Sequence, residues 1–371
     1  MTLPSNEESL IVCLLLQISL APANRYELLP SFAAMTDSER DAFLAIANCN
    51  HVLVRTLERI RDVAVRSDST LNPTYPFPPA SIRQWAEANL SREKSRIANA
   101  VRHLRRICDL LESSDCPVTV IKTLDHWPDF GSDLDLYTTA DESLLRKFML
   151  WGLRARQMPP SWGDRLAHKL NFEVPGLPEA VEIHVQRLGQ TGEHLLLARR
   201  FADRCVPKEV GGYTFMVPAP EERIVVATLQ RMYRHFYFRV SDIVNTAALV
   251  ESGTVDFGEL KKVADLGGIW PGICSYLNIV DGYLRRLSGR ALRLPDEVVG
   301  KARFGAESTF IRARFIRVPV MPHSAGLYTR QLAGTAARGS LPAAFRLALL
   351  PPLAGAAAVS LRITGSDKGV W

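Results

Sequence analysis

The sequence predicts an α+β protein in which a small mixed β-sheet lies between helical regions at both ends of the chain. Short runs rich in β-branched residues are confined to the middle third of the sequence. Apolar residues recur at helical spacing on both sides of that part. The hydrophobic fraction of 47% and the charged fraction of 23% are ordinary for a soluble globular protein, which excludes a disordered chain and a membrane bundle as starting points.

The N-terminal helical region is expected to span residues 1–113. Helical periodicity runs through residues 5–66, and the apolar run Leu10–Ala21 follows two glutamates rather than a basic segment, which favours a buried helix over a signal peptide. The proline-rich stretch NPTYPFPP at 72–79 interrupts this pattern. Ser81 is then expected to cap a long helix with one buried stripe, formed by Ile97, Val101, Leu104, Cys108 and Leu111.

The α/β core is expected over residues 114–218. Four runs have the composition of strands: VTVIK at 118–122, DLDLY at 133–137, LNFEV at 170–174 and AVEIHV at 180–185. A helix-length segment follows the second run, and Gly211-Gly212 predicts a hairpin turn. These elements predict a small sheet with one helix inserted.

Helical periodicity returns after Pro220, which predicts a helical domain over 219–290 with Ser241 as a possible helix cap. The remaining region, 291–371, is rich in arginine (FIRARFIR) and then in alanine, leucine and proline. Its arginines and phenylalanines are compatible with nucleic-acid binding, but an amphipathic surface element is favoured. The tail is expected to dock on the protein, and peripheral contact with a membrane is the alternative.

The charge and the cysteines add two expectations. A net charge of +6 and a pI near 9.0 favour anionic partners without selecting one. The six cysteines show no spacing typical of a metal site and are expected to be reduced. With no uninterrupted apolar segment of about 18 residues, a cytoplasmic location is predicted.

Three carboxylates carry the chemistry that the sequence predicts. In a strand, residues two apart point to the same face, so Asp133 and Asp135 are expected to lie together. The same alternation places Glu182 and His184 on one face of their strand. If the two strands are neighbours, Glu182 becomes a third carboxylate, and such a group is typical of a site for Mg²⁺ or Mn²⁺.

Residues 117–251 resemble the nucleotidyltransferase superfamily to which DNA polymerase beta belongs, and more closely its poorly characterised bacterial stand-alone branch. The matching segments are VTVIKTLDHWPDFGSDLDLYTTAD, AVEIHVQRLG and the helical stretch from Pro218 to Val250. The resemblance implies a metal-dependent enzyme that moves a nucleotidyl group from an NTP to an acceptor, which is a small molecule, a protein or an RNA. The acceptor is not identified by the sequence.

The resemblance also assigns roles. Asp133 and Asp135 would hold two metal ions and Glu182 would complete the site. Lys122 would face the triphosphate, and Gly131 and Ser132 are further candidates for contact with the nucleotide. The sequence departs from the family in one place: the Gly-Ser or Lys-Gly step that usually lies about ten residues before the carboxylates is here Lys122-Thr123.

Two other interpretations stay open. The D-x-D motif also occurs in nucleotide-sugar glycosyltransferases, which would require parallel strands before residue 110. A non-catalytic descendant that binds a nucleotide or a partner is the second, because Thr123 replaces a glycine. His184 is a secondary candidate, and the basic cluster Arg231, Arg234, His235 and Arg239 near Asp242 is expected to form a structural ion pair.

Overall fold

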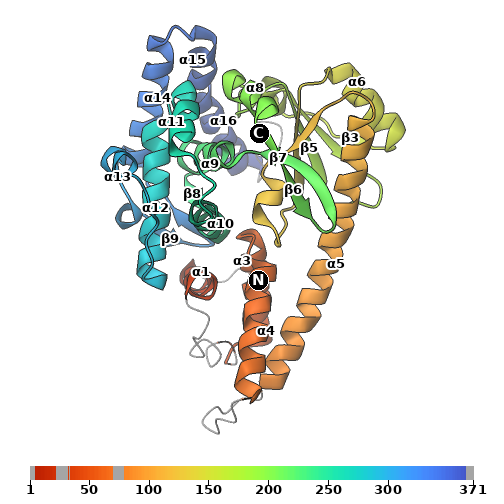
Figure 1. The fold of residues 1–371 in the computed structure, drawn as a ribbon, viewed down its shortest axis with the longest axis vertical. Coiled ribbons are helices and arrows are strands. Elements are labelled where there is room, and N and C mark those ends of the chain that lie inside the picture. The colour runs from red at the N-terminus through yellow and green to blue at the C-terminus, as the bar shows by residue number, and fades with distance from the viewer. Residues whose placement is uncertain (1–4, 22–31, 33, 70–78, 365–371) are drawn as a thin grey trace.

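The computed structural model describes residues 5–21, 32, 34–69 and 79–364. Figure 1 shows the central sheet with α6 at the upper right, helices α9 to α15 at the upper left, and α4 with part of α5 projecting at the bottom. The sheet is therefore flanked by helices from both ends of the chain, and the α+β prediction is confirmed.

Four helices precede the sheet in the described part of the chain: α1 (Ser5–Leu20), α3 (Asp37–Cys49), α4 (Leu53–Ser69) and α5 (Pro79–Glu112). The apolar run after Leu10 forms a buried helix, as predicted. Most of the proline-rich stretch 72–79 lies outside the described residues. The prediction that Ser81 caps α5 is wrong: the helix begins at Pro79, because a proline is tolerated in the first helical turn, where its missing N–H has no partner to lose.

The central sheet has five strands in the order β1-β2-β5-β4-β3. Their bounds are β1 (Val118–Val120), β2 (Asp133–Thr138), β3 (Arg156–Gln157), β4 (Lys169–Glu173) and β5 (Ala180–Val185). Strands β2 and β5 are parallel, whereas β1 with β2, β4 with β5, and β3 with β4 are antiparallel, so the sheet is mixed. The pairing of β2 with β5 is the feature that assembles the site.

The two faces of the sheet are covered differently. Leu134, Leu136, Val181 and Ile183 belong to the main hydrophobic core, which α5 joins from the N-terminal region. On the opposite face a smaller cluster contains Ile121, Tyr137, Leu188, Ala198 and Phe201, the last two from α8 (Leu195–Asp203). The predicted site residues Asp135 and Glu182 lie on this second face, beside the smaller cluster.

The connections within the core are partly as expected. The predicted hairpin is confirmed: β6 (Cys205–Val210) and β7 (Tyr213–Pro218) are joined by Gly211 and Gly212, both at positive φ. The helix predicted after β2 is short, since α6 (Glu142–Lys147) passes into a single π-helical turn at Phe148–Gly152. The short strand β3 and helix α7 (Trp162–Ala167) were not predicted.

Helices follow the core: α9 (Pro220–Thr228), a π-helical turn (Leu229–Arg234), α10 (Val240–Glu251), α11 (Phe257–Gly267), α12 (Trp270–Ser288) and α13 (Asp296–Lys301). The prediction of Ser241 as a cap is wrong. The N-cap of α10 is Arg239, whose backbone N–H donates to the Asp242 carboxylate, and Ser241 is buried inside the first turn.

The arginine-rich segment FIRARFIR forms a β-hairpin. Its strands β9 (Phe310–Arg312) and β10 (Phe315–Arg317) form a three-stranded sheet with β8 (Tyr237–Phe238). The alternation of this segment puts Ile316 into the core, while Phe310 stays exposed. It packs beside α1 and so connects the two ends of the chain.

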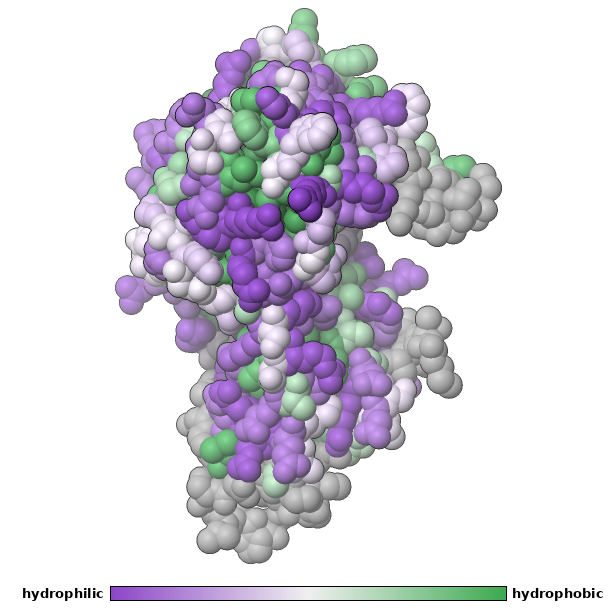
Figure 2. Space-filling view, turned by 90° about the vertical axis from the view of Figure 1, so that its right-hand side faces the viewer, coloured by the Kyte–Doolittle hydropathy of each residue, from purple (hydrophilic) through white to green (hydrophobic). Residues whose placement is uncertain are grey.

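The C-terminal helices are α14 (Ala325–Ala337), α15 (Leu341–Ala348) and α16 (Leu350–Thr364). Helix α15 contacts the rest of the protein through Arg346, which donates to the Leu166 carbonyl at 3.0 Å, and through the Leu347 carbonyl, which accepts from Tyr328. None of the helices in the described ranges is long and apolar enough to cross a membrane. Viewed from the side of α5 and β3, the surface is mostly hydrophilic around a small hydrophobic patch (Figure 2).

Candidate metal and nucleotide site

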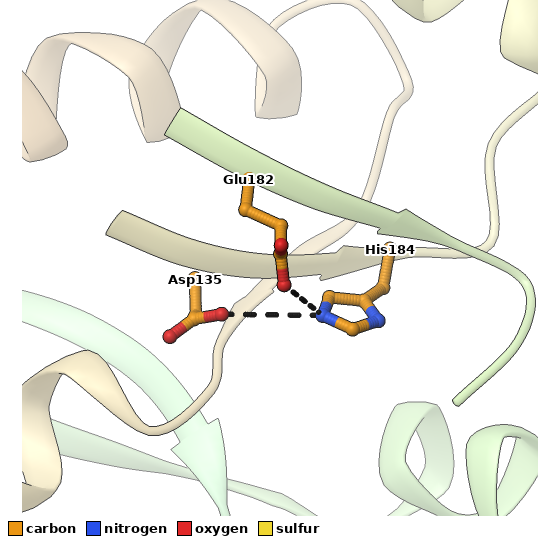
Figure 3. Close-up of side chains that lie close together, drawn as sticks. All are labelled: Asp135, Glu182 and His184. Carbon is orange, nitrogen blue, oxygen red and sulfur yellow. Dashed lines mark hydrogen bonds and ion pairs between the residues drawn. The ribbon is translucent and has the colours of Figure 1, made fainter. Parts of the chain in front are cut away.

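The parallel pairing of β2 and β5 places Asp135 directly opposite Glu182. Both side chains leave the same face of the sheet, and His184 follows two residues further along β5 (Figure 3). One ligand atom from each of the three residues lies within 4.8 Å of the others. The sequence predicted this meeting of Asp135 with Glu182, on condition that the two strands were neighbours.

The His184 side chain forms a hydrogen bond with the Glu182 carboxylate. Its Nε2 lies 2.9 Å from Glu182 Oε1 and 3.9 Å from Asp135 Oδ1. Burial and the nearby Lys169 ammonium lower the pKa of His184 to about 3, so the ring is neutral. Nε2 therefore donates to the Glu182 carboxylate, and Nδ1 carries the lone pair.

Two lysines form ion pairs with the carboxylates. Lys122 forms an ion pair with Asp135, and its ammonium is 3.8 Å from Glu182 Oε1. Lys169, on β4, places its ammonium 3.0 Å from Glu182 Oε1. Each carboxylate thus has a lysine partner, half-buried at Lys122 and buried at Lys169, an arrangement that lets two acidic groups share one side of a sheet.

The protonation of the two carboxylates differs although they lie opposite each other. Burial raises the pKa of Asp135 to about 7, opposed by Lys122 and assisted by Glu182. Burial would also raise the pKa of Glu182, but Lys169 and His184 lower it well below its usual range. Glu182 is therefore the carboxylate that keeps its charge, and Asp135 changes protonation near neutral pH.

The loop between β1 and β2 explains how Lys122 reaches the site. Lys122 has φ 62° and ψ −53°, and the Thr123 N–H donates to the Ile121 carbonyl at 2.6 Å, which makes a tight turn at Lys122. The Thr123 hydroxyl accepts from the Asp135 N–H at 2.7 Å. Thr123 therefore fastens the loop to strand β2.

Asp133 lies outside the group that Asp135 forms. It is the exposed first residue of β2, and its carboxylate accepts from the Ser132 hydroxyl at 2.9 Å. Ser132 is exposed as well, and Gly131 is buried beside the ring of His51. The metal-binding role of Asp133 and the nucleotide contacts of Gly131 and Ser132 stay predictions.

Two arginines of the basic cluster, Arg231 and Arg234, differ in their surroundings. Arg231 Nε lies 2.7 Å from the buried Asp242 Oδ2, an ion pair of the kind predicted. Arg234 is exposed, and its charge acts on both Lys122 and Lys169. Arg234 also lines a cavity next to the carboxylates.

Lys169 is the part of the site that sequence reasoning missed. The alternation in KLNFE places Lys169 on the same face as Asn171. Only the pairing of β4 with β5, in which Lys169 is opposite His184 and Asn171 opposite Glu182, shows which face that is. A lysine at the start of a strand with alternating polar and apolar residues was the available signal.

Comparisons with known proteins give little further information. No family model and no curated protein matches the sequence. The crystal structure of an antigenic nucleotidyltransferase-like protein from Paracoccidioides brasiliensis is similar over 46% of this chain and 85% of that chain, with 14% sequence identity and a TM-score of 0.30. A similarity of this degree carries no weight for function, so the chemistry rests on the residues of the site.

Proposed function

We propose that this protein is a metal-dependent nucleotidyltransferase that moves a nucleotidyl group from an NTP to an acceptor. The observation that supports the proposal most directly is the register of β2 and β5, which sets Asp135 opposite Glu182 and beside His184. Transfer of a nucleotidyl group requires neutralisation of phosphate charge and alignment of the reacting groups, for which clustered carboxylates and a cation are the usual means.

The donor set fits a hard divalent cation such as Mg²⁺ or Mn²⁺. Asp135 and Glu182 would supply carboxylate oxygens, the ligands that these ions prefer. His184 would hold Glu182 in place through the hydrogen bond at 2.9 Å, as groups behind metal ligands commonly do. When bound, the ion would neutralise charge that develops on the phosphate oxygens. Exposed Asp133 could contribute from the open end of β2.

The phosphates of the NTP would meet side-chain cations. Lys122 lies beside Asp135, and Arg234 faces the same region from the π-helical turn after α9. A cation at the carboxylates would compete with Lys122 for Asp135, which leaves the ammonium available to a phosphate. Lys122 is therefore the proposed phosphate-binding residue, as the sequence resemblance implied.

Turnover tests the proposal. The purified protein is incubated with labelled NTPs and Mg²⁺ or Mn²⁺, and transfer to cell extract or release of pyrophosphate is followed. Asp135→Asn and Glu182→Gln should each reduce the rate at least about 100-fold, because charge stabilisation worth about 3 kcal/mol is lost. Asp109→Asn, an exposed site on α5, is the matched control and should keep the wild-type rate. Equal rates for all variants would refute the proposal.

The pairing of both carboxylates with lysines favours one alternative, a non-catalytic descendant that binds a nucleotide. Calorimetric binding of NTP with no turnover would select it. The glycosyltransferase alternative has lost its support, because the described residues before position 110 are helical and contain no strand.

A further inference from the structure

Helix α15 turns apolar side chains toward solvent and its one charged side chain toward the protein. The helix has the sequence LPAAFRLA, in which Arg346 is the only ionisable residue. The Arg346 guanidinium is half-buried and donates to the carbonyls of Leu166, at 3.0 Å, and Thr191. Leu341 and Phe345 are each 67% exposed. This arrangement is the reverse of an ordinary surface helix, whose charged residues face water.

The exposed apolar side chains of α15 form one face of the helix. Leu341, Phe345 and Ala348 follow one another at spacings of four and three, which brings them to the same side. A groove of about 740 Å³ lies on the other side of α15, where Ala343 and Arg346 line it together with residues of α8 and α11. The two carboxylates that line this groove therefore lie across the helix from the exposed apolar face.

Helix α16 extends the apolar surface. The sequence contains no charged residue from Leu347 to Leu361. Leu353 is half-buried, Val359 is exposed, and none of the α16 side chains that the structure describes is buried. Figure 1 shows α15 at the upper end of the molecule, opposite the end formed by α4. Exposed apolar surface of this kind usually marks a contact with another molecule.

The charge around these two helices indicates that the other molecule is anionic. From Ser308 to Ser366 the sequence contains seven arginines and neither aspartate nor glutamate. Because the net charge of the whole chain is +6, this segment carries all of the excess positive charge. Arg330 on α14 and Arg338 at the end of that helix are exposed, and neither forms an ion pair with a carboxylate of the described residues.

A lipid surface fits these observations better than a second copy of the chain. A symmetric contact between two copies would bring the arginine-rich segment of one copy against the same segment of the other, and like charges repel. An anionic bilayer offers acyl chains to the apolar side chains and phosphates to the arginines.

We propose that α15 and α16 bind the surface of an anionic membrane, with Leu341 and Phe345 in the headgroup region and with Arg330 and Arg338 against lipid phosphates. The proposal goes beyond the proposed function and does not depend on it, because neither helix contributes a residue to the carboxylate site.

Vesicle binding by the full-length protein tests this proposal. Sedimentation is measured with vesicles of phosphatidylcholine and with vesicles of an equimolar mixture of phosphatidylcholine and phosphatidylglycerol, in the absence of NTP and metal ions. The protein should bind the mixed vesicles at least about tenfold more tightly, because arginines near an anionic surface are attracted to it. A high concentration of NaCl should reduce this preference.

The double variant Leu341→Ser/Phe345→Ser removes the apolar contact. Its binding to the mixed vesicles should be weaker by about tenfold or more, since two large apolar side chains no longer leave water on binding. Both side chains are exposed in the free protein, so the melting temperature should stay at the wild-type value. Leu10→Ser replaces a leucine on α1 that is 68% exposed and is the matched control, which should bind as wild type does.

The variant Arg338→Gln tests the charge separately. It should weaken binding to the mixed vesicles about threefold or more and leave binding to phosphatidylcholine unchanged. Arg102→Gln, which replaces an exposed arginine of α5, is the control for the loss of one positive charge and should bind as wild type does.

Several results would overturn the proposal. These are failure to bind the mixed vesicles, equal binding to the two kinds of vesicle, and wild-type binding by the Leu341→Ser/Phe345→Ser protein. A dimer in solution that this double variant dissociates would assign the apolar face to a second copy and would overturn the proposal as well. Asp135→Asn should abolish transfer and leave vesicle binding unchanged, so failure of the proposed function can be told apart from failure of this one.

Discussion

Replacement of Lys169 by methionine is the sharpest test of the metal site that does not depend on activity. Lys169 is 5% exposed, and its ammonium lies 3.0 Å from Glu182 Oε1. Methionine keeps much of the volume of the side chain and removes the charge. Glu182, whose pKa is held well below its usual range by Lys169 among others, would then be a half-buried carboxylate without its main counter-charge.

The expected loss of stability can be estimated. Removal of one partner from a buried ion pair costs about 3–5 kcal/mol, because the other charge stays buried and unpaired. For a chain of this size the melting temperature should fall on the order of 5–10 °C. A divalent cation at Asp135 and Glu182 replaces the missing charge, and at 100 times its Kd it stabilises the protein by about 2.7 kcal/mol.

The assay is thermal unfolding of wild-type and Lys169→Met protein in EDTA, in Mg²⁺ and in Mn²⁺. The variant should recover at least half of its lost stability in one of the two ions and should gain more from it than wild type does. The double variant Lys169→Met/Glu182→Gln is the control. Its melting temperature in EDTA should be higher than that of the single variant, and it should not change when Mg²⁺ or Mn²⁺ is added. If the ions leave the single variant unchanged, the carboxylates are not a metal site.

Two further predictions concern the helices around the site. Burial raises the pKa of Asp129 to about 7. Between pH 4 and 7 the folded protein therefore keeps a proton on this carboxyl that the unfolded chain releases. The free energy of unfolding consequently falls as the pH rises through this range, by up to about 4 kcal/mol. Asp129→Asn should remove this loss; urea unfolding of both proteins at pH 4, 5.5 and 7.5 measures it, and a constant difference across pH would contradict it. Arg231→Met should cost about 3–5 kcal/mol by leaving Asp242 buried and unpaired, in contrast to Arg234→Met at the exposed position, which should change the unfolding midpoint little.

Strand alternation predicted the central part of the site because it depends only on local geometry. Asp135 shares a face with Asp133, and Glu182 shares one with His184, in any extended chain. The sequence could not say that Asp133 begins its strand and so stays exposed, because the start of a strand is decided by the turn before it. Lys169 was missed for a related reason: strand order is a property of the whole sheet.

In the C-terminal half, too, the sequence could not predict an element that depends on a distant strand. The helical domain predicted over 219–290 is present, but its first helix, α9, passes into a π-helical turn and the strand β8. Strand β8 exists because β10 of FIRARFIR, in which Ile316 pairs with Phe238 and Arg317 with Tyr237, lies beside it in the sheet. A two-residue strand has too little local signal to be found without its partner.

The departure at Thr123 has a physical consequence for phosphate binding. A glycine at this position would leave backbone N–H groups free to approach a phosphate. Here the Thr123 N–H donates a hydrogen bond to the Ile121 carbonyl, and the Thr123 hydroxyl accepts one from the Asp135 N–H. These two hydrogen bonds fix the loop to the sheet. That attachment also holds Lys122 at a positive φ that a non-glycine residue adopts only when its surroundings impose it. In the proposed function, recognition of the phosphates would therefore pass from backbone N–H groups to the Lys122 ammonium, which a cation bound at Asp135 would release toward the nucleotide.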